Sequence, residues 1–169
     1  MKPSPLFDAV PIGLELPMLE KGPLGPVHLM RWSAAMENWH RIHYDHAFAT
    51  GHDGLPDLLI NGSLKQQFIA QLLRDWAGDA GWVWKVGFRF RAMNTVGQTL
   101  RVWARVTERQ RLANYGLVRL ELGVIDEDGR ESTPGWAEVA LPLSADAPVP
   151  YPFTPPATGQ PQPPPQPQP

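Results

Sequence analysis

The stretch SLKQQFIAQLLRDW, residues Ser63 to Trp76, decides the fold of this 169-residue chain. Its apolar members are Leu64, Phe68, Ile69, Leu72, Leu73 and Trp76. This spacing places them on one face of a helix about 21 Å long. Gly78 stands where such a helix is expected to end. The stretch therefore predicts a long helix at the centre of a hydrophobic core.

The hydrophobic period after this helix is two, which is typical of strands with one buried face. Apolar side chains alternate with polar ones over residues 82–90, 100–106, 118–124 and 137–141. Turn residues occupy 94–97 and 126–129. The order predicts four strands in an antiparallel meander. Upstream, Ile12, Leu14 and Leu16 suggest one more short strand, and Ser33 is predicted as a helix N-cap.

One apolar helix face and one apolar sheet face must bury each other. The pattern predicts an α+β fold in which a curved antiparallel sheet wraps around one long helix, and it leaves other α+β rolls open. Of the 20 prolines, 11 lie in the last 25 positions. We therefore expect one domain over residues 1–144 and a disordered tail rich in proline and glutamine over 145–169.

Composition excludes several classes of function. The formal charge is −2, which is too little for the field that nucleic-acid binding needs. The chain has no cysteine, so disulfides, thiolate metal sites and a cysteine nucleophile are excluded. No signal peptide and no apolar run of about 18 residues is evident, so we expect a cytoplasmic protein that does not enter the membrane.

The histidine-rich stretch ENWHRIHYD, residues Glu37 to Asp45, carries the chemistry. Together with Asn61-Gly62-Ser63-Leu64 and the turn at 94–100, it resembles the MaoC-like acyl-thioester hydratases and dehydratases. The branch it resembles most includes hydroxyacyl-thioester dehydratase type 2 and the mesaconyl-CoA hydratases. This resemblance implies a hot-dog fold and a hydro-lyase that adds water reversibly to a 2-enoyl thioester.

The same resemblance implies a catalytic set of His43, Asn38 and Gly62. In the family, an Asp and a His bind one water, while a main-chain N–H at the start of the central helix donates a hydrogen bond to the thioester oxygen. Here Asn38 stands at the Asp position. An amide can orient a water but cannot take its proton, so the proton must go to His43, whose usual pKa of about 6.5 suits a base. Glu37 or Asp45 is an alternative source of the missing carboxylate.

The predicted substrate-binding residues surround this set. Trp39 and Tyr44 are expected to form walls of the acyl pocket. Asp45, Asn61 and Ser63 complete the group. Arginines on the sheet, among them Arg101 and Arg105, could meet coenzyme A phosphates, but a solvated sheet face is the commoner explanation for such a pattern.

Other interpretations stay open. A metal site could be formed by three histidines at a spacing of three, His40, His43 and His46. On a helix they would spread over too wide an angle, and no fourth ligand is evident. We therefore expect neither a metal nor a cofactor. Gly62 could simply be a turn before a helix. The chain could also be a non-catalytic hot-dog subunit or a thioesterase of the same fold. The expected partners are a coenzyme A or acyl-carrier-protein thioester and further subunits, in a homodimer or larger assembly or in a hetero-oligomer.

Overall fold

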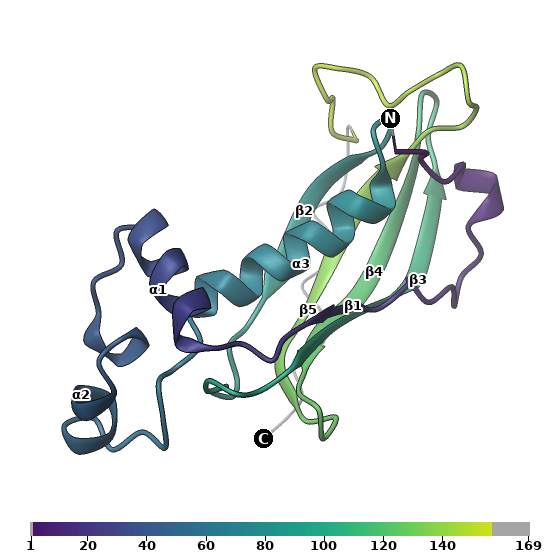
Figure 1. The fold of residues 1–169 in the computed structure, drawn as a ribbon. Coiled ribbons are helices and arrows are strands. Elements are labelled where there is room, and N and C mark those ends of the chain that lie inside the picture. Colours follow the sequence, from purple (N-terminus) through teal and green to yellow (C-terminus); the bar gives the residue numbers. More distant parts are fainter. Residues whose placement is uncertain (1, 157–169) are drawn as a thin grey trace.

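The computed structural model describes residues 2–156 and shows a curved antiparallel sheet wrapped around one long helix (Figure 1). The strands are β1 (Leu19–Lys21), β2 (Trp82–Phe88), β3 (Leu100–Arg111), β4 (Gly116–Ile125) and β5 (Glu131–Leu141). The helices are η1 (Phe7–Ala9), α1 (Pro26–Ala35), η2 (Arg41–His43), α2 (His46–Gly51) and α3 (Gly62–Ala77). This arrangement confirms the predicted α+β hot-dog fold. Among the described residues, no helix is long and apolar enough to cross a membrane.

Helix α3 forms the centre of the core, as its periodicity predicts. Ile69 and Leu73 have no exposed surface, and Phe68 is 7% exposed. They pack against the inward side chains of the sheet, which include Val102, Ala104, Val106, Leu120, Leu122, Val124, Ala137 and Val139. Burying one such leucine stabilises the fold by roughly 1.5–3 kcal/mol. The helix ends at Gly78, whose φ of 67° suits glycine better than any other residue.

The sheet is not the simple meander that the sequence suggests. Its strand order is β1-β3-β4-β5-β2, and all neighbours are antiparallel. Strands β3, β4 and β5 follow one another, but β2 pairs with β5 at the far edge. Periodicity identifies a strand and its buried face, whereas it carries no information about which strand lies beside it.

Two details of the strands also correct the sequence analysis. The register of β2 shifts between Val83 and Lys85, so Val83 and Phe88 pack against the core while Trp82 stays 40% exposed. The expected strand at 12–16 is instead an extended segment along β3, held by bonds such as Leu16 N to Ala104 O at 2.9 Å. The strand itself comes later, at β1.

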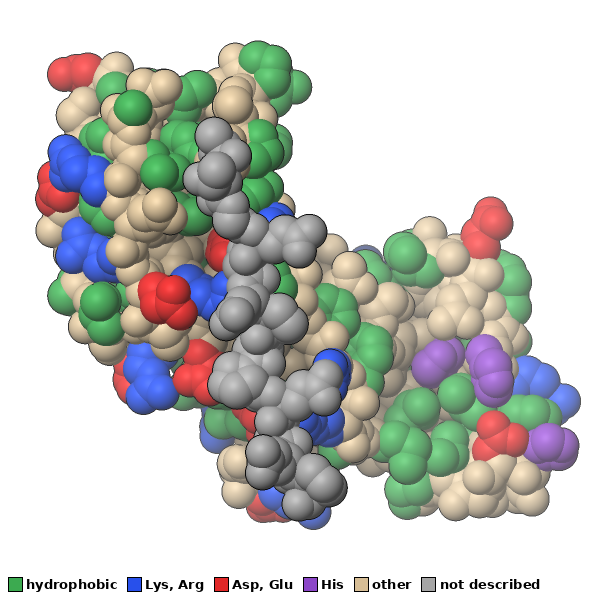
Figure 2. All heavy atoms as spheres, turned by 180° about the vertical axis from the view of Figure 1, so that it is seen from behind, with side chains coloured by type: hydrophobic (Ala, Val, Ile, Leu, Met, Phe, Trp, Pro, Cys, Tyr) green, Lys and Arg blue, Asp and Glu red, His purple; other side chains and the backbone are tan. Residues whose placement is uncertain are grey.

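Residues 26–61 project beyond one end of the sheet and carry α1, η2 and α2 (Figure 1). We call this part the projecting segment. It starts with Pro26 at the first position of α1, where a missing N–H costs nothing. It ends at Asn61, directly before α3. Seen from behind, histidine side chains gather on this part of the molecule (Figure 2). The projecting segment therefore brings the histidine-rich motif to the start of the central helix.

The segment after β5 packs on the sheet face opposite α3. Val149 N donates to Ala80 O at 2.9 Å, and Tyr115 Oη donates to Thr154 O at 2.8 Å. Phe153 lies against Trp82 with 5.9 Å between ring centroids. Part of the predicted disordered tail is thus packed, whereas its remainder, 157–169, lies outside the described residues.

Candidate active site

His43 is buried at the end of η2, with 7% of its surface exposed. Its Nδ1 lies 2.8 Å from Leu59 O. Because a carbonyl can only accept, Nδ1 must donate, and the neutral ring then keeps Nε2 as a free acceptor. Burial lowers the pKa of His43 below its usual value, which outweighs the opposite effect of the bond to Leu59. His43 is therefore a neutral imidazole at pH 7 with an available base nitrogen.

The loop around His43 is held by its own hydrogen bonds. Arg41 contacts Asp45 Oδ2 at 2.7 Å, and Phe48 N donates to Asp45 Oδ1 at 3.0 Å. The Phe48 amide and then the Arg41 guanidinium hold the pKa of Asp45 below its usual range. Tyr44 Oη donates to Trp39 O at 2.7 Å. Both Asp45 oxygens and the Tyr44 hydroxyl thus serve the loop itself.

Asn38 is half-buried and faces its own loop. Its Oδ1 accepts from His40 N at 3.3 Å, and its main-chain N donates to Ser33 O at 2.9 Å. Within residues 2–156, no hydrogen bond joins Asn38 to His43. The side-chain NH2 group of the Asn38 amide is the part that is left to donate a hydrogen bond to a water. Neighbouring Trp39 is 59% exposed and does not form a closed wall in the single chain.

The start of α3 is clamped by α1 through two side-chain hydrogen bonds. Asn61 is fully buried and its Nδ2 donates to Ser33 Oγ at 3.0 Å. Trp32 Nε1 donates to Ser63 Oγ at 2.8 Å. Because Asn61 does not cap the helix with its side chain, helix geometry leaves the first amides, those of Gly62 and Ser63, without intrahelical acceptors.

Phe90 covers Gly62 from the side of β2. A Cβ built on Gly62 would lie 2.9 Å from the Phe90 ring. Glycine at this position therefore allows an aromatic ring to rest on the first turn of the helix. Phe90 is 52% exposed, and Lys65 Nζ lies 5.4 Å from the centroid of its ring.

Lys65 ties the first turn of α3 to the turn after β2. Its Nζ donates to Ala92 O and Asn94 Oδ1, both at 3.1 Å, and to Ser132 Oγ at 3.4 Å. Lys65 is 3% exposed, and burial lowers its pKa to about 8. Asn94 O in turn accepts from Ile60 N at 2.8 Å. The residue before Ile60 is Leu59, the partner of His43, so one continuous network positions the imidazole and the helix start.

Known proteins that are similar to this chain share its fold, and several carry the name of the family that the sequence resembles. A family model, hydroxyacyl-thioester dehydratase type 2, matches residues 18–98, which include His43 and α3. The MaoC-like dehydratase from Rhodospirillum rubrum superposes with a TM-score of 0.70 at 12% identity, covering 81% of this chain and 96% of its own. Over this stretch of sequence and in its fold, the chain is similar to the MaoC-like proteins. No protein with curated annotation matches it in sequence.

Two further structures resemble this chain. The unliganded R-hydratase PhaJ1 from Pseudomonas aeruginosa has a TM-score of 0.71 at 20% identity, covering 82% of this chain and 86% of its own. One chain of the ChsH1-ChsH2 complex from Mycobacterium tuberculosis has a TM-score of 0.66 at 18% identity, and the match covers 77% of this chain and 97% of that one. At such identities the likeness establishes the fold.

The candidate site contains residues that sequence reasoning missed. Ser33 is predicted as an N-cap, but it lies inside α1, fully buried against Asn61. No sequence motif marks Trp32, Phe90 or Lys65. The one signal in the sequence is that Lys65 stands among the apolar positions of the central helix. The structure brings His43, Asn61 and Gly62 to one end of α3, whereas it gives Asp45 to the loop. Within residues 2–156, no group of three His, Asp or Glu side chains is placed to hold a metal ion.

Proposed function

We propose that the protein is an acyl-thioester hydro-lyase that adds water reversibly to a 2-enoyl thioester. The observation that carries the proposal is the tautomer of His43, fixed by the 2.8 Å bond from Nδ1 to Leu59 O. It leaves Nε2 as a buried base beside a helix start. Leu59, which accepts the hydrogen bond of His43, is three residues before Gly62 at the helix start. The Cα atoms of Leu59 and Gly62 can therefore lie at most about 11 Å apart.

The reaction needs one base and no redox step. His43 Nε2 takes a proton from water while the water oxygen bonds to the β-carbon of the enoyl group. The electron pair of the double bond shifts toward the thioester carbonyl and forms an enolate. The α-carbon then takes the proton back from His43, which regenerates the neutral imidazole. Dehydration is the same sequence in reverse.

The enolate oxygen requires hydrogen-bond donors, and the first turn of α3 offers them. The amides of Gly62 and Ser63 point out of the helix start, where the helix dipole is positive. Donors fixed in this way typically lower a barrier by about 2.7 to 4 kcal/mol each. The absence of a side chain on Gly62 permits a thioester to approach closely.

A second candidate function is an acyl-thioester-binding subunit that supports a catalytic partner. The observation that favours it is Asn38, which stands at the position of the family's carboxylate and already accepts from His40 N. Strands β1 and β2 are the two edges of the sheet, and unpaired edges suit pairing with another subunit. A homodimer or a hetero-oligomer is part of the proposal, and the ChsH1-ChsH2 structure is an example of a complex with this fold.

A two-channel assay tests the proposal. Purified protein is mixed with enoyl thioesters of coenzyme A and of acyl carrier protein, and two signals are followed: absorbance of the conjugated double bond and release of free thiol. Because the chain contains no cysteine, a thiol reagent reports only the released carrier. Loss of the double bond without thiol release supports the hydro-lyase. Thiol release would indicate a thioesterase, and no turnover in either channel would favour the binding subunit.

Asn38→Asp should shift the pH profile of turnover. The new carboxylate keeps an acceptor for His40 N, so we expect the fold to be retained. If Asn38 and His43 share one water, the negative charge raises the pKa of His43, and the acidic limb of the rate profile moves to higher pH. A profile identical to that of the wild type would place Asn38 outside the site.

Gly62→Ala should lower kcat/KM about tenfold, which corresponds to about 1.4 kcal/mol of transition-state stabilisation. The new methyl group would lie 2.9 Å from Phe90, so the ring must move across the helix start. The double variant Gly62→Ala with Phe90→Ala separates two causes. Recovery in the double variant identifies ring displacement, whereas continued loss identifies a methyl group that blocks the thioester. A single variant with wild-type kinetics would remove Gly62 from the site.

A further inference from the structure

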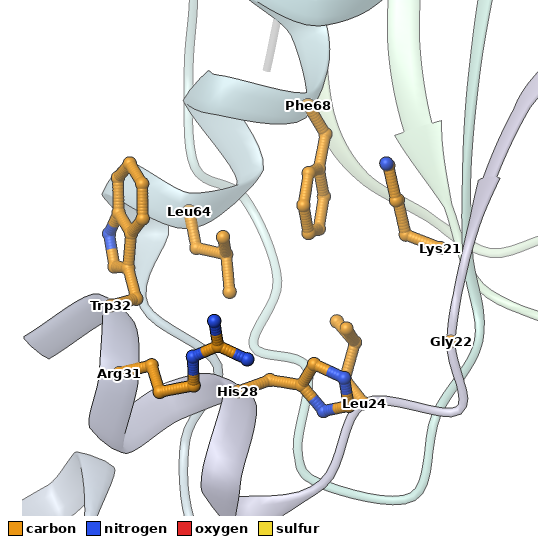
Figure 3. A pocket seen from close by; sticks show the side chains of 8 residues that line it. All are labelled: Lys21, Gly22, Leu24, His28, Arg31, Trp32, Leu64 and Phe68. Atoms are coloured by element: carbon orange, nitrogen blue, oxygen red, sulfur yellow. The ribbon is translucent and has the colours of Figure 1, made fainter.

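A cavity of ≈ 400 Å³ lies between α1, β1 and the first two turns of α3 (Figure 3). Its volume falls in the range of about 300–1,000 Å³ that is typical of small-molecule sites. Its apolar lining comes from Leu24, Leu64, Phe68 and Trp32. Trp32 also donates to Ser63 Oγ at 2.8 Å. The cavity therefore adjoins the helix start where the thioester is proposed to bind.

The polar lining of this cavity is basic. It comes from Lys21, His28 and Arg31, and no acidic side chain of residues 2–156 contributes to it. In Figure 3, Arg31 reaches in from α1, while Lys21 reaches in from β1 on the opposite side. Gly25 N donates to His28 Nδ1 at 3.0 Å, so a neutral His28 carries its proton on Nε2 and adds a third donor.

These cations are only weakly compensated. Within residues 2–156, the Arg31 side chain makes no hydrogen bond or ion pair. The Lys21 ammonium makes none either and lies over the Phe68 ring, 5.7 Å from Nζ to the centroid. Asp75 is the acid that Lys21 influences. The pKa of Asp75 is lowered chiefly by its bond to Lys2, at 3.1 Å, and least by Lys21. By contrast, Arg101 and Arg105 on the sheet are paired with Glu20 and Glu121.

We propose that this cavity binds the apolar chain of a ligand that also carries an anionic group, and that Lys21 and Arg31 bind that anion. The inference rests on the proposed function for the identity of the ligand as an acyl thioester. The anion then has two sources: a carboxylate at the far end of the acyl chain, or a phosphate of the carrier. Leu64 and Phe68 are one helical turn apart, about 6 Å along α3, so a short chain beginning at the first turn reaches the level of Lys21.

Binding of saturated thioesters tests this inference without any turnover. Calorimetry compares three probes: adipyl-CoA, which ends in a carboxylate; hexanoyl-CoA, which has the same length and ends in a methyl group; and adipyl-pantetheine, which lacks the nucleotide phosphates. The variants are Lys21→Met and Arg31→Met, which keep an apolar stem. Lys85→Met is the matched control, because Lys85 lies over Trp84 on β2, outside the cavity lining.

An acyl carboxylate predicts that wild-type protein prefers adipyl-CoA to hexanoyl-CoA. Either variant should then weaken the binding of both adipyl probes by about 10- to 100-fold and leave that of hexanoyl-CoA unchanged. A carrier phosphate predicts equal weakening of both coenzyme A probes and no change for adipyl-pantetheine. Unchanged affinities for all three probes in both variants, with melting temperatures showing folded protein, would overturn the inference, as would no binding to the wild type. If the probes bind as expected but no enoyl thioester is hydrated, the cavity assignment stands and the proposed function fails.

Discussion

His43→Ala is expected to lower the rate of enoyl-thioester hydration by about 10²- to 10⁴-fold, the usual contribution of a general base. The variant removes the buried Nε2 that would take the proton of water. We expect the fold to be retained, because the variant removes only the hydrogen bond to Leu59 O and leaves a small space in the projecting segment, away from the helix and sheet that form the core. The measurement is single-substrate kinetics on the enoyl thioester that turns over fastest, with circular dichroism as a check on folding.

His46→Ala is the matched control for this variant. His46 is three positions away on α2 and its side chain is 65% exposed, so its removal should leave the rate unchanged. The pH profile gives a second readout. The neutral imidazole is the active form, and burial lowers the pKa of His43, so the rate should rise with pH through a midpoint below 6.5 and stay level above 7. Equal rates in His43→Ala and His46→Ala would exclude His43 as the base.

Lys65→Ala is expected to destabilise the fold by about 3 kcal/mol at pH 7. The variant deletes a buried side chain and leaves Ala92 O, Asn94 Oδ1 and Ser132 Oγ without their donor. Each buried group that loses its partner costs about 1–3 kcal/mol. Water that enters the space left by the lysine side chain recovers part of this cost. Urea denaturation measures the change. Lys85→Ala on strand β2 is the control and should change stability by less than about 1 kcal/mol.

Alkaline pH should increase the difference between wild type and Lys65→Ala. The pKa of Lys65 is about 8 in the folded protein against 10.5 for the ordinary group. Between these values the unfolded chain binds the proton more tightly, so raising the pH stabilises the folded wild type, by up to about 3 kcal/mol. The variant lacks this group and gains nothing from it. A difference that stays constant from pH 7 to 10 would contradict the burial of a charged Lys65.

The sequence predicts the helix and the core strands because their periods are long and regular. The stripe from Leu64 to Trp76 spans most of α3, and the alternation over 100–106 lies in β3. Strand neighbours are different, since β2 and β5 pair through contacts between residues about 50 positions apart. The bulge at Val83 is likewise invisible to a strict period of two, and it reverses the side on which Trp82 was expected.

The candidate site can be predicted from the sequence only where a short motif marks it. His43 and Gly62 stand out because the motif and the helix start can each be read from a few adjacent residues. Ser33, Phe90 and Lys65 could not be found in this way, because they reach the site from other elements and their types are common in any fold. Asp45 is the opposite case: its place in the motif suggests a chemical role, and in the structure its carboxylate caps α2.

The acceptor that fixes the His43 tautomer is a main-chain carbonyl rather than a side chain. No substitution at position 59 deletes that oxygen, so the protonation pattern of the imidazole is protected against most single mutations. Proline is the exception of interest, because Leu59 N also donates to Ile42 O at 2.9 Å and proline has no N–H. We therefore expect most substitutions at position 59 to leave activity intact, although this residue contacts the proposed base, and we expect proline to abolish it.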